Sequence, residues 1–440
     1  MANTHLSRTP SVEPTSRYKG TLSVWVKRGK ADAESFIFYG FESNSNKMKI
    51  DFKSDSSLQI NTVQAGSNRI VYETNRKFRD VNAWYHIVVA IDTTLATAGD
   101  RVRLYVNGVE ETSFSTETHP AQNSLHMMTD NGTPIYIGSE NGGNYFNGSM
   151  SHYHLIDGTQ YTASAFGETD ATTGEWKIKT SPSVTYGNNG FWILKDGNSV
   201  TDASPNTNNL TVSSGTLTKT EDCPSNVFAT INPLDNFYNS ATLTNGNNTV
   251  ATGTGNPSWN YITSTLGFST GKFYWELKLG TGNSNIFGFA ARVTTATNDQ
   301  LGSSAAQWGY QKAGNFESNS SSLATLSSVT TNDIVGFAID ATNNKAYIHK
   351  NGTYMNSGNP STGANGITIA SPDAGGGIGF YFPAFGDGDT TSDTYHANFG
   401  NGYFGTTAVA SAGANASGNG IFEYDVPTGY TALSTKGLNL

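Results

Sequence analysis

Carboxylates are the first residues of this chain whose spacing could support catalysis. Two of them hydrolyse a glycosidic bond when one donates a proton while the other attacks or activates water. Acidic residues at three alternate strand positions would share one face. The closest patterns are Glu168, Asp170 and Glu175 in a turn-rich stretch, and the pair Glu423 and Asp425. The first leaves the alternating register and the second lacks a third member, so we predict no catalytic residues and a protein that is not an enzyme.

Histidine and cysteine offer equally little. His152 and His154 alternate in the segment SHYHL and would lie on one strand face, which is half of a metal site without an evident third ligand. Cys223 is the only cysteine and stands in a polar stretch with no histidine nearby. Neither a nucleophile elbow nor a phosphate-binding glycine loop occurs. Packing or surface roles fit these three residues better than chemistry.

Sugar binding asks for different residues, namely exposed aromatic rings that stack on pyranose faces and amides that bond the hydroxyls. The segment ENGGNYFNG supplies Asn141, Asn144 and Tyr145 at the edge of a predicted sandwich. A second candidate is QWGYQKAGNF, with Trp308 and Tyr310. For Trp308 the alternative is packing in the core.

The elements that must position these residues are β-strands. Apolar residues alternate or cluster in short runs, while no helical periodicity persists over three turns. The phrases DRVRLYVNGVE and NNKAYIHKNGTY each place an Asn-Gly step after alternating apolar residues, which is typical of a two-residue hairpin turn. The fold class we predict is all-β, with two antiparallel, jelly-roll-like β-sandwich domains in tandem. Strands are expected at 21–28, 84–92, 134–138, 272–279 and 378–382.

The division of the chain follows its composition. Charged side chains thin out after residue 225, and the stretch before that point is polar and turn-rich. We predict a first domain with its trailing segment at 1–195, a linker at 196–234 and a second domain at 235–440. A small, polar insertion at 405–420 interrupts the second domain; we expect a surface loop there, with a docking strap as the alternative.

Overall composition narrows the partners. The 440 residues carry a net charge of −9 without a basic stripe, so we expect no nucleic-acid partner. No apolar run reaches the roughly 20 residues that span a bilayer, and the start lacks the apolar core of a secretory signal. We therefore expect synthesis in a cytoplasm, no membrane insertion, and release by a route such as assembly into a virus particle.

The first half resembles the laminin-G and pentraxin-like branch of the concanavalin A-like sandwiches over residues 15–160. The matching phrases are TLSVWVKRG, WYHIVVAIDTT, RVRLYVNGVEE and PIYIGSENGGNYFNG. The resemblance implies Ca²⁺ bound through loops at the rim, because carboxylate and amide oxygens suit this ion. The Ca²⁺ candidates are Asp130 and Asn131 in TDNG, and, in the second half, Asp387, Asp389 and Asp393 in FGDGDTTSD.

The second half resembles the SPRY sandwich. Its marks include GKFYWELKL, DIVGFAIDATNNKAYIHKNGTY and VPTGYTAL. The residues that fit the family's strand-and-turn pattern are Asp333, Gly336, Asp340, Lys350, Asn351 and Gly352. The insertion at 405–420 departs from this family's pattern, so the sequence does not define where the edge of the second sandwich lies.

Between the two lies QYTASAFGETDATTGEWKIKTSPSVTYGNNGFWILKD, which resembles a segment that follows such domains in virion proteins of tailed bacteriophages, marine ones especially. This resemblance implies a non-enzymatic protein of the virion surface, either a tail or fibre adhesin or a head decoration. Its partners would be other virion proteins and a host-surface glycan, and a homo-oligomer is expected because sandwich edges offer strands to neighbours. The alternatives are a polysaccharide hydrolase or depolymerase and a cellular adhesin.

Overall fold

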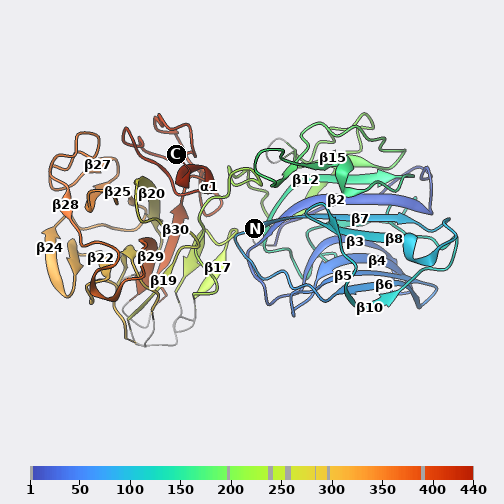
Figure 1. The fold of residues 1–440 in the computed structure, drawn as a ribbon, viewed down its shortest axis with the longest axis horizontal. Coiled ribbons are helices and arrows are strands. Elements are labelled where there is room, and N and C mark those ends of the chain that lie inside the picture. Colours follow the sequence, from blue (N-terminus) through green and yellow to red (C-terminus); the bar gives the residue numbers. More distant parts are fainter. Residues whose placement is uncertain are drawn as a thin grey trace. The chain divides into compact units, whose positions relative to one another are not determined.

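The computed structural model describes residues 3–195, 199–235, 241–252, 259–282, 284–294, 298–387 and 392–439. The chain forms two compact units, Met1–Lys219 and Thr220–Leu440 (Figure 1). Within the described residues, strands dominate, and the helical elements are η1 at Ala98–Asp100, η2 at Ala163–Ala165, η3 at Ala374–Gly376 and α1 at Thr435–Leu438. The predicted all-β class is confirmed. No helix in this described part is long and apolar enough to cross a membrane.

The first unit contains two large sheets. One has the order β10-β6-β5-β4-β3-β11-β1-β16, with bounds Phe114–Thr118, Ser67–Thr74, Leu58–Gln64, Asn46–Phe52, Ser35–Ser43, Ile135–Ile137, His5–Arg8 and Thr211–Ser214. The other has the order β15-β12-β2-β7-β8-β9, with bounds Phe191–Ile193, Gly148–Asp157, Lys19–Arg28, Trp84–Asp92, Val102–Val106 and Val109–Glu110. A two-stranded sheet pairs β13, Gly167–Thr169, with β14, Trp176–Ile178.

The second unit repeats this plan. Its nine-stranded sheet has the path β17-β18-β30-β20-β25-β26-β27, with β28 on β26 and β33 on β20. The bounds in that order are Thr242–Thr244, Thr249–Ala251, Thr394–Asn398, Lys272–Leu279, Ile334–Asp340, Lys345–Lys350, Thr353–Tyr354, Ile367–Thr368 and Thr431–Ala432. The six-stranded sheet β19-β29-β21-β22-β23-β24 spans Asn260–Thr263, Phe382–Asp387, Ile286–Ala290, Gln307–Gln311, Asn315–Ser318 and Ser321–Thr325. A short hairpin joins β31, Tyr403–Phe404, to β32, Thr407–Ala408.

Both predicted Asn-Gly hairpins are confirmed. Val106 pairs with Val109 across Asn107 and Gly108, and Lys350 pairs with Thr353 across the second Asn-Gly step. All four turn residues have positive φ, from 48° to 82°. Only this backbone region matches the twist of the strands in a two-residue turn, and asparagine and glycine enter it at the lowest cost.

The predicted strands are confirmed with one exception. The runs 84–92 and 272–279 are β7 and β20, and 21–28 and 134–138 fall on β2 and β11. The prediction for 378–382 is wrong, because β29 begins only at Phe382. Ile378 and Phe380 are exposed, so the apolar run there is part of a surface loop.

The stretch predicted as a linker, 196–234, is divided between the two units. Residues 196–198 lie outside the described residues. Leu210 belongs to the first core, and β16 pairs with β1. Phe228 and Ile231 are buried in the second unit, so the chain passes from one unit to the other at 219–220.

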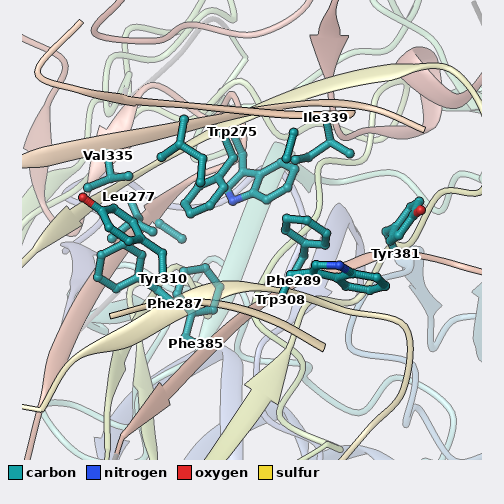
Figure 2. Close-up of a cluster of buried hydrophobic side chains, with 14 of the residues drawn as sticks. Trp275, Leu277, Phe287, Phe289, Trp308, Tyr310, Val335, Ile339, Tyr381 and Phe385 are labelled. Carbon is teal, nitrogen blue, oxygen red and sulfur yellow. The ribbon is translucent and has the colours of Figure 1, made fainter. Parts of the chain in front are cut away.

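The second core contains many aromatic rings packed among aliphatic side chains (Figure 2). Trp308 stacks on Phe289 with ring centroids 5.1 Å apart and an interplanar angle of 17°. Tyr310 meets Phe287 edge-on at 5.2 Å. Trp308 and Tyr310 are both 0% exposed, so the prediction of a sugar site there is wrong. Their strand alternation turns both rings towards the facing sheet, and the core alternative holds for Trp308.

Two outer sheet faces are covered by later segments of the chain. In the first unit, residues 161–186 pack on the six-stranded sheet, where Trp176 Nε1 donates a 2.9 Å hydrogen bond to His86 Nδ1. In the second, Phe422 and Tyr430 pack on Tyr274 of β20. The insertion at 405–420 is a mainly exposed loop, as predicted, but hydrogen bonds tie it to 421–426.

Replacing Trp308 by alanine is expected to destabilise the second unit by about 3–5 kcal/mol, because it opens a large cavity among buried rings. The matched change Phe380→Ala, at a ring that is 46% exposed, should alter stability by less than about 1 kcal/mol. Urea unfolding, followed on the transition of the second unit, measures both. Equal losses for the two variants would contradict the buried position of Trp308.

Candidate functional site

The outer face of the eight-stranded sheet carries a continuous row of aromatic rings. Strand alternation sends Ile50 of β4 and Ile135 and Ile137 of β11 into the core. Their neighbours along the strands, such as Lys49 and Tyr136, therefore face outwards. Tyr136 lies directly opposite Tyr39 in the β11–β3 pairing. We call the whole set the aromatic row; its members are His5, Phe36, Tyr39, Phe41, Tyr136 and Tyr145.

The rings of the aromatic row contact one another in sequence across three strands. Tyr39 stacks on Phe41 at 5.4 Å and lies 6.4 Å from Tyr136. His5 is 5.9 Å from both Tyr136 and Tyr145, and therefore joins the sheet to the neighbouring loop. Tyr136 and Tyr145 are half-buried, whereas Phe36 and Tyr39 are buried.

Loop 139–147, which follows β11, places Tyr145 beside this row. Asn141 and Asn144 have φ of 48° and 45°, a conformation that asparagine tolerates well, and both side chains are exposed. The Asn144 carbonyl accepts a 3.3 Å hydrogen bond from Phe36 N at the start of β3. Phe146 is buried in the first core and anchors the end of the loop. The three residues predicted from ENGGNYFNG therefore lie together at the edge of the row.

A polar network borders the rings. The Asn144 side-chain amide donates to Glu140 Oε2 at 2.9 Å and to Glu34 Oε2 at 3.3 Å. Lys49 Nζ lies 3.6 Å from both Glu34 Oε1 and Asp51 Oδ1, and 5.6 Å above the ring of Phe36. Three carboxylates, one ammonium group and one amide thus meet at one end of the aromatic row.

Asp51 is the most unusual member of this network. Its side chain is fully buried, and neither carboxylate oxygen has a hydrogen-bond donor among the described residues. Burial raises the pKa of Asp51 to about 7, although the Lys49 ammonium acts in the opposite direction. Burial also raises the pKa of Tyr39 to about 12, with a further contribution from the charge on Glu140. Tyr39 is therefore neutral at pH 7, whereas Asp51 is about half protonated at that pH and mostly neutral below it.

Sequence reasoning missed most of this face. Glu34, Lys49 and Asp51 stand on or beside β3 and β4, about 90 to 105 residues before loop 139–147. Alternation in PIYIG would have placed Tyr136 on the face opposite to Ile135 and Ile137. In FIFYGF, a register shift between Phe36 and Phe38 interrupts the alternation, and the sequence does not mark it. These residues come together because β3 pairs with β11, although the two strands are far apart in the sequence.

The first predicted Ca²⁺ pair is engaged otherwise. Asp130 accepts two hydrogen bonds from Arg17, at 3.2 Å from Nε and 2.9 Å from Nη2. The Asn131 amide donates to Glu13 Oε1 at 2.9 Å and is exposed. The guanidinium holds the position that a cation would need at Asp130.

The second predicted Ca²⁺ group is described only in part. Asp387 and Asp393 are buried on either side of Thr252, whose hydroxyl donates to Asp387 Oδ2 at 2.6 Å. Asp389 lies outside the described residues. Ca²⁺ at this loop stays a prediction.

The remaining candidates have structural partners. His154 is buried, with Nδ1 2.9 Å from the Tyr186 hydroxyl, and β12 changes register between Ser151 and His154. Asp170 accepts the backbone amides of Thr172 and Thr173. Across the described ranges, no group of three or more His, Cys, Asp or Glu side chains could hold a metal ion.

Residues 2–160 match the model of the Concanavalin A-like lectin/glucanases superfamily. Among solved structures, the SPRY domain of human HERC1 is 17% identical, covering 38% of this chain and 96% of that one, with a TM-score of 0.30. The heptameric SAP-like pentraxin from Limulus polyphemus is 19% identical, covering 36% and 71%, with a TM-score of 0.27. Domain 4 of the arabinanase AbnA from Geobacillus stearothermophilus, in complex with arabinotriose, is 16% identical, covering 34% and 64%, with a TM-score of 0.26. No curated protein matches the chain.

Replacing Asp51 by asparagine is expected to make the stability of the first unit less dependent on pH. A carboxyl whose pKa rises on folding stabilises the folded state at low pH and loses that contribution as pH rises through about 7. The free energy of unfolding of Asp51→Asn, measured relative to that of the unsubstituted chain, should therefore rise by roughly 2–4 kcal/mol from pH 5 to pH 8. Urea unfolding at both pH values measures the difference, and the same difference at both would contradict this account.

Proposed function

We propose that this chain is a non-enzymatic carbohydrate-binding protein whose first unit holds glycans on the aromatic row and loop 139–147. The proposal rests on one observation: the half-buried rings of Tyr136 and Tyr145 lie beside a group of carboxylates and an amide on the same sheet face. Ring faces stack on the apolar faces of pyranoses, while carboxylates accept hydrogen bonds from sugar hydroxyls. The match of residues 2–160 to a lectin and glucanase model supports the same ligand class.

Within this face the groups have separate roles. Tyr136 and Tyr145 provide the stacking surface, since their rings are partly exposed on either side of His5. Asn144, which is exposed, and Glu140, which is half-buried, lie at its border and bond the ligand's hydroxyls. Lys49 keeps Glu34 in place through an ion pair at 3.6 Å.

The biological setting we propose is the surface of a phage virion, as a tail or fibre adhesin or as a head decoration. The resemblance of residues 160–196 to segments of phage virion proteins supports it. Host-surface glycans and other virion proteins would be the partners, with homo-oligomers formed through sheet edges such as β16 and β9. A cellular adhesin is the alternative setting for the same binding face.

A polysaccharide hydrolase is the second candidate, and one observation favours it. Glu34 and Asp51 lie within 3.6 Å of the same ammonium, and Asp51 has the raised pKa that a general acid needs. Against it, the side chain of Asp51 is fully buried, so the face would have to open before a glycosidic oxygen could reach it. Incubation of the chain with host polysaccharide decides the matter: release of reducing ends would favour the hydrolase over the binder.

The double variant Tyr136→Ala, Tyr145→Ala is expected to weaken glycan binding by at least tenfold, because both stacking surfaces are lost. Tyr18→Ala is the matched control, since Tyr18 is 38% exposed in the same unit and outside the row. A glycan array identifies a ligand, and calorimetry with that ligand measures all three proteins. Unchanged affinity in the double variant, or an equal loss in the control, would overturn the proposed face.

A further inference from the structure

A second candidate binding site lies in the second unit, beside the insertion. Two adjoining hollows, of about 590 and 410 Å³, share Tyr354, Ala414 and Asp425 in their walls. The larger one is completed by loop 411–414, by 423–424 and by His349 and Gly352. We call the two hollows together the strap cleft. None of its residues takes part in the aromatic row.

The wall formed by the insertion is held in place from below. Glu276 is fully buried on β20 and accepts hydrogen bonds of 2.9 Å from the backbone amides of Glu423 and Tyr424. Gly413 N donates to the Phe422 carbonyl at 2.9 Å, and Val426 N donates to that of Ala414 at 2.8 Å. The cleft therefore exists before any ligand arrives, which lowers the cost of binding.

Two tyrosines supply its aromatic walls. Tyr354 and Tyr424 both meet the ring of His349 edge-on, at 5.3 and 5.2 Å. A Cβ at Gly352 would lie 2.6 Å from Tyr424 Cδ1, so this glycine makes room for the ring. The Tyr354 hydroxyl is buried, and no hydrogen-bond partner for it is found in the described part of the chain.

The charge of the cleft has one sign. Glu423 Oε2 and Asp425 Oδ1 each accept one backbone amide of the insertion, from Ala410 and Ala414, which leaves the second oxygen of each carboxylate for a ligand. Lysine and arginine are absent from the residues described as lining both hollows. His349 is buried and its pKa falls to about 3, so it stays neutral.

We propose that the strap cleft binds the guanidinium group of an arginine in a basic peptide segment of a partner protein. A planar cation fits between tyrosine faces and carboxylates, because aromatic faces attract cations and carboxylates form charge-assisted hydrogen bonds with them. Arginine is favoured over lysine because its flat group stacks on a ring while its N–H groups reach a carboxylate. The second hollow, across Asp425, accommodates the neighbouring residue of the peptide.

A pair of capped peptides that differ in one heavy atom and its hydrogens tests this with the unsubstituted chain. One carries arginine between glycines and serines; the other carries citrulline, which has the same shape without the charge. Calorimetry on the full-length protein should show binding of the arginine peptide that weakens with salt, and at least tenfold weaker binding of the citrulline peptide. Equal affinity for the two, or binding of neither, would overturn the proposal.

The double variant Glu423→Gln, Asp425→Asn places the site. The new side-chain carbonyl oxygens can still accept the backbone N–H groups of Ala410 and Ala414, so the insertion should stay folded. Circular dichroism checks this. We expect at least a tenfold loss of affinity for the arginine peptide. Asp373→Asn is the matched control, because Asp373 is exposed in the same unit and lines neither hollow. Unchanged affinity in the double variant, or a similar loss in the control, would contradict the assignment.

Discussion

The structure of both units depends on one constraint: apolar side chains on both faces of a β-sheet have to be covered. Strand alternation sends one set of side chains into the core between two sheets and the other set outwards. In this chain the outward set is also rich in apolar and aromatic residues, such as Val88 and Ala90 on β7 or Tyr274 and Tyr347 on β20 and β26. Such a face is stable only when something covers it, since each exposed apolar side chain loses its burial free energy. The outer face therefore determines where the rest of the chain must go.

Each unit meets this demand with its own later residues. In the first, the segment after β12 carries Phe166 and Trp176 onto the six-stranded sheet, and Trp176 satisfies the buried ring nitrogen of His86. In the second, the buried carboxylate of Glu276 fixes the backbone at 423–424 while Phe422 packs beside it. The outer face of the eight-stranded sheet is covered only in part: Phe36 and Tyr39 are buried there, while Tyr136 and Tyr145 are half-buried. Our proposal for glycan binding starts from this difference.

Local sequence was sufficient wherever the structure depends on neighbours along the chain. Asn107 and Gly108 mark a hairpin because two consecutive residues need positive φ. Tyr145 and Asn144 were predicted as sugar-binding residues from residue type alone, and because their loop is short and continuous the structure keeps them close together. The rest of the face depends on the order of β4, β3, β11 and β1, which brings Lys49, Tyr39 and Tyr136 side by side from distant positions. Trp308 shows the same limit of sequence-based prediction: alternation shows which residues share a face, but it does not say which of the two faces is buried.

Hydrogen–deuterium exchange on the full-length protein, with and without a bound oligosaccharide, tests the central claim most directly. The account predicts that exchange slows in peptides covering 34–41, 47–51 and 136–147, where the aromatic row and its polar border lie. Peptides from 272–279 and 334–350, in the second unit, should exchange as before. Slower exchange confined to the second unit, or none in the three segments at saturating ligand, would contradict the assignment of glycan binding to this face.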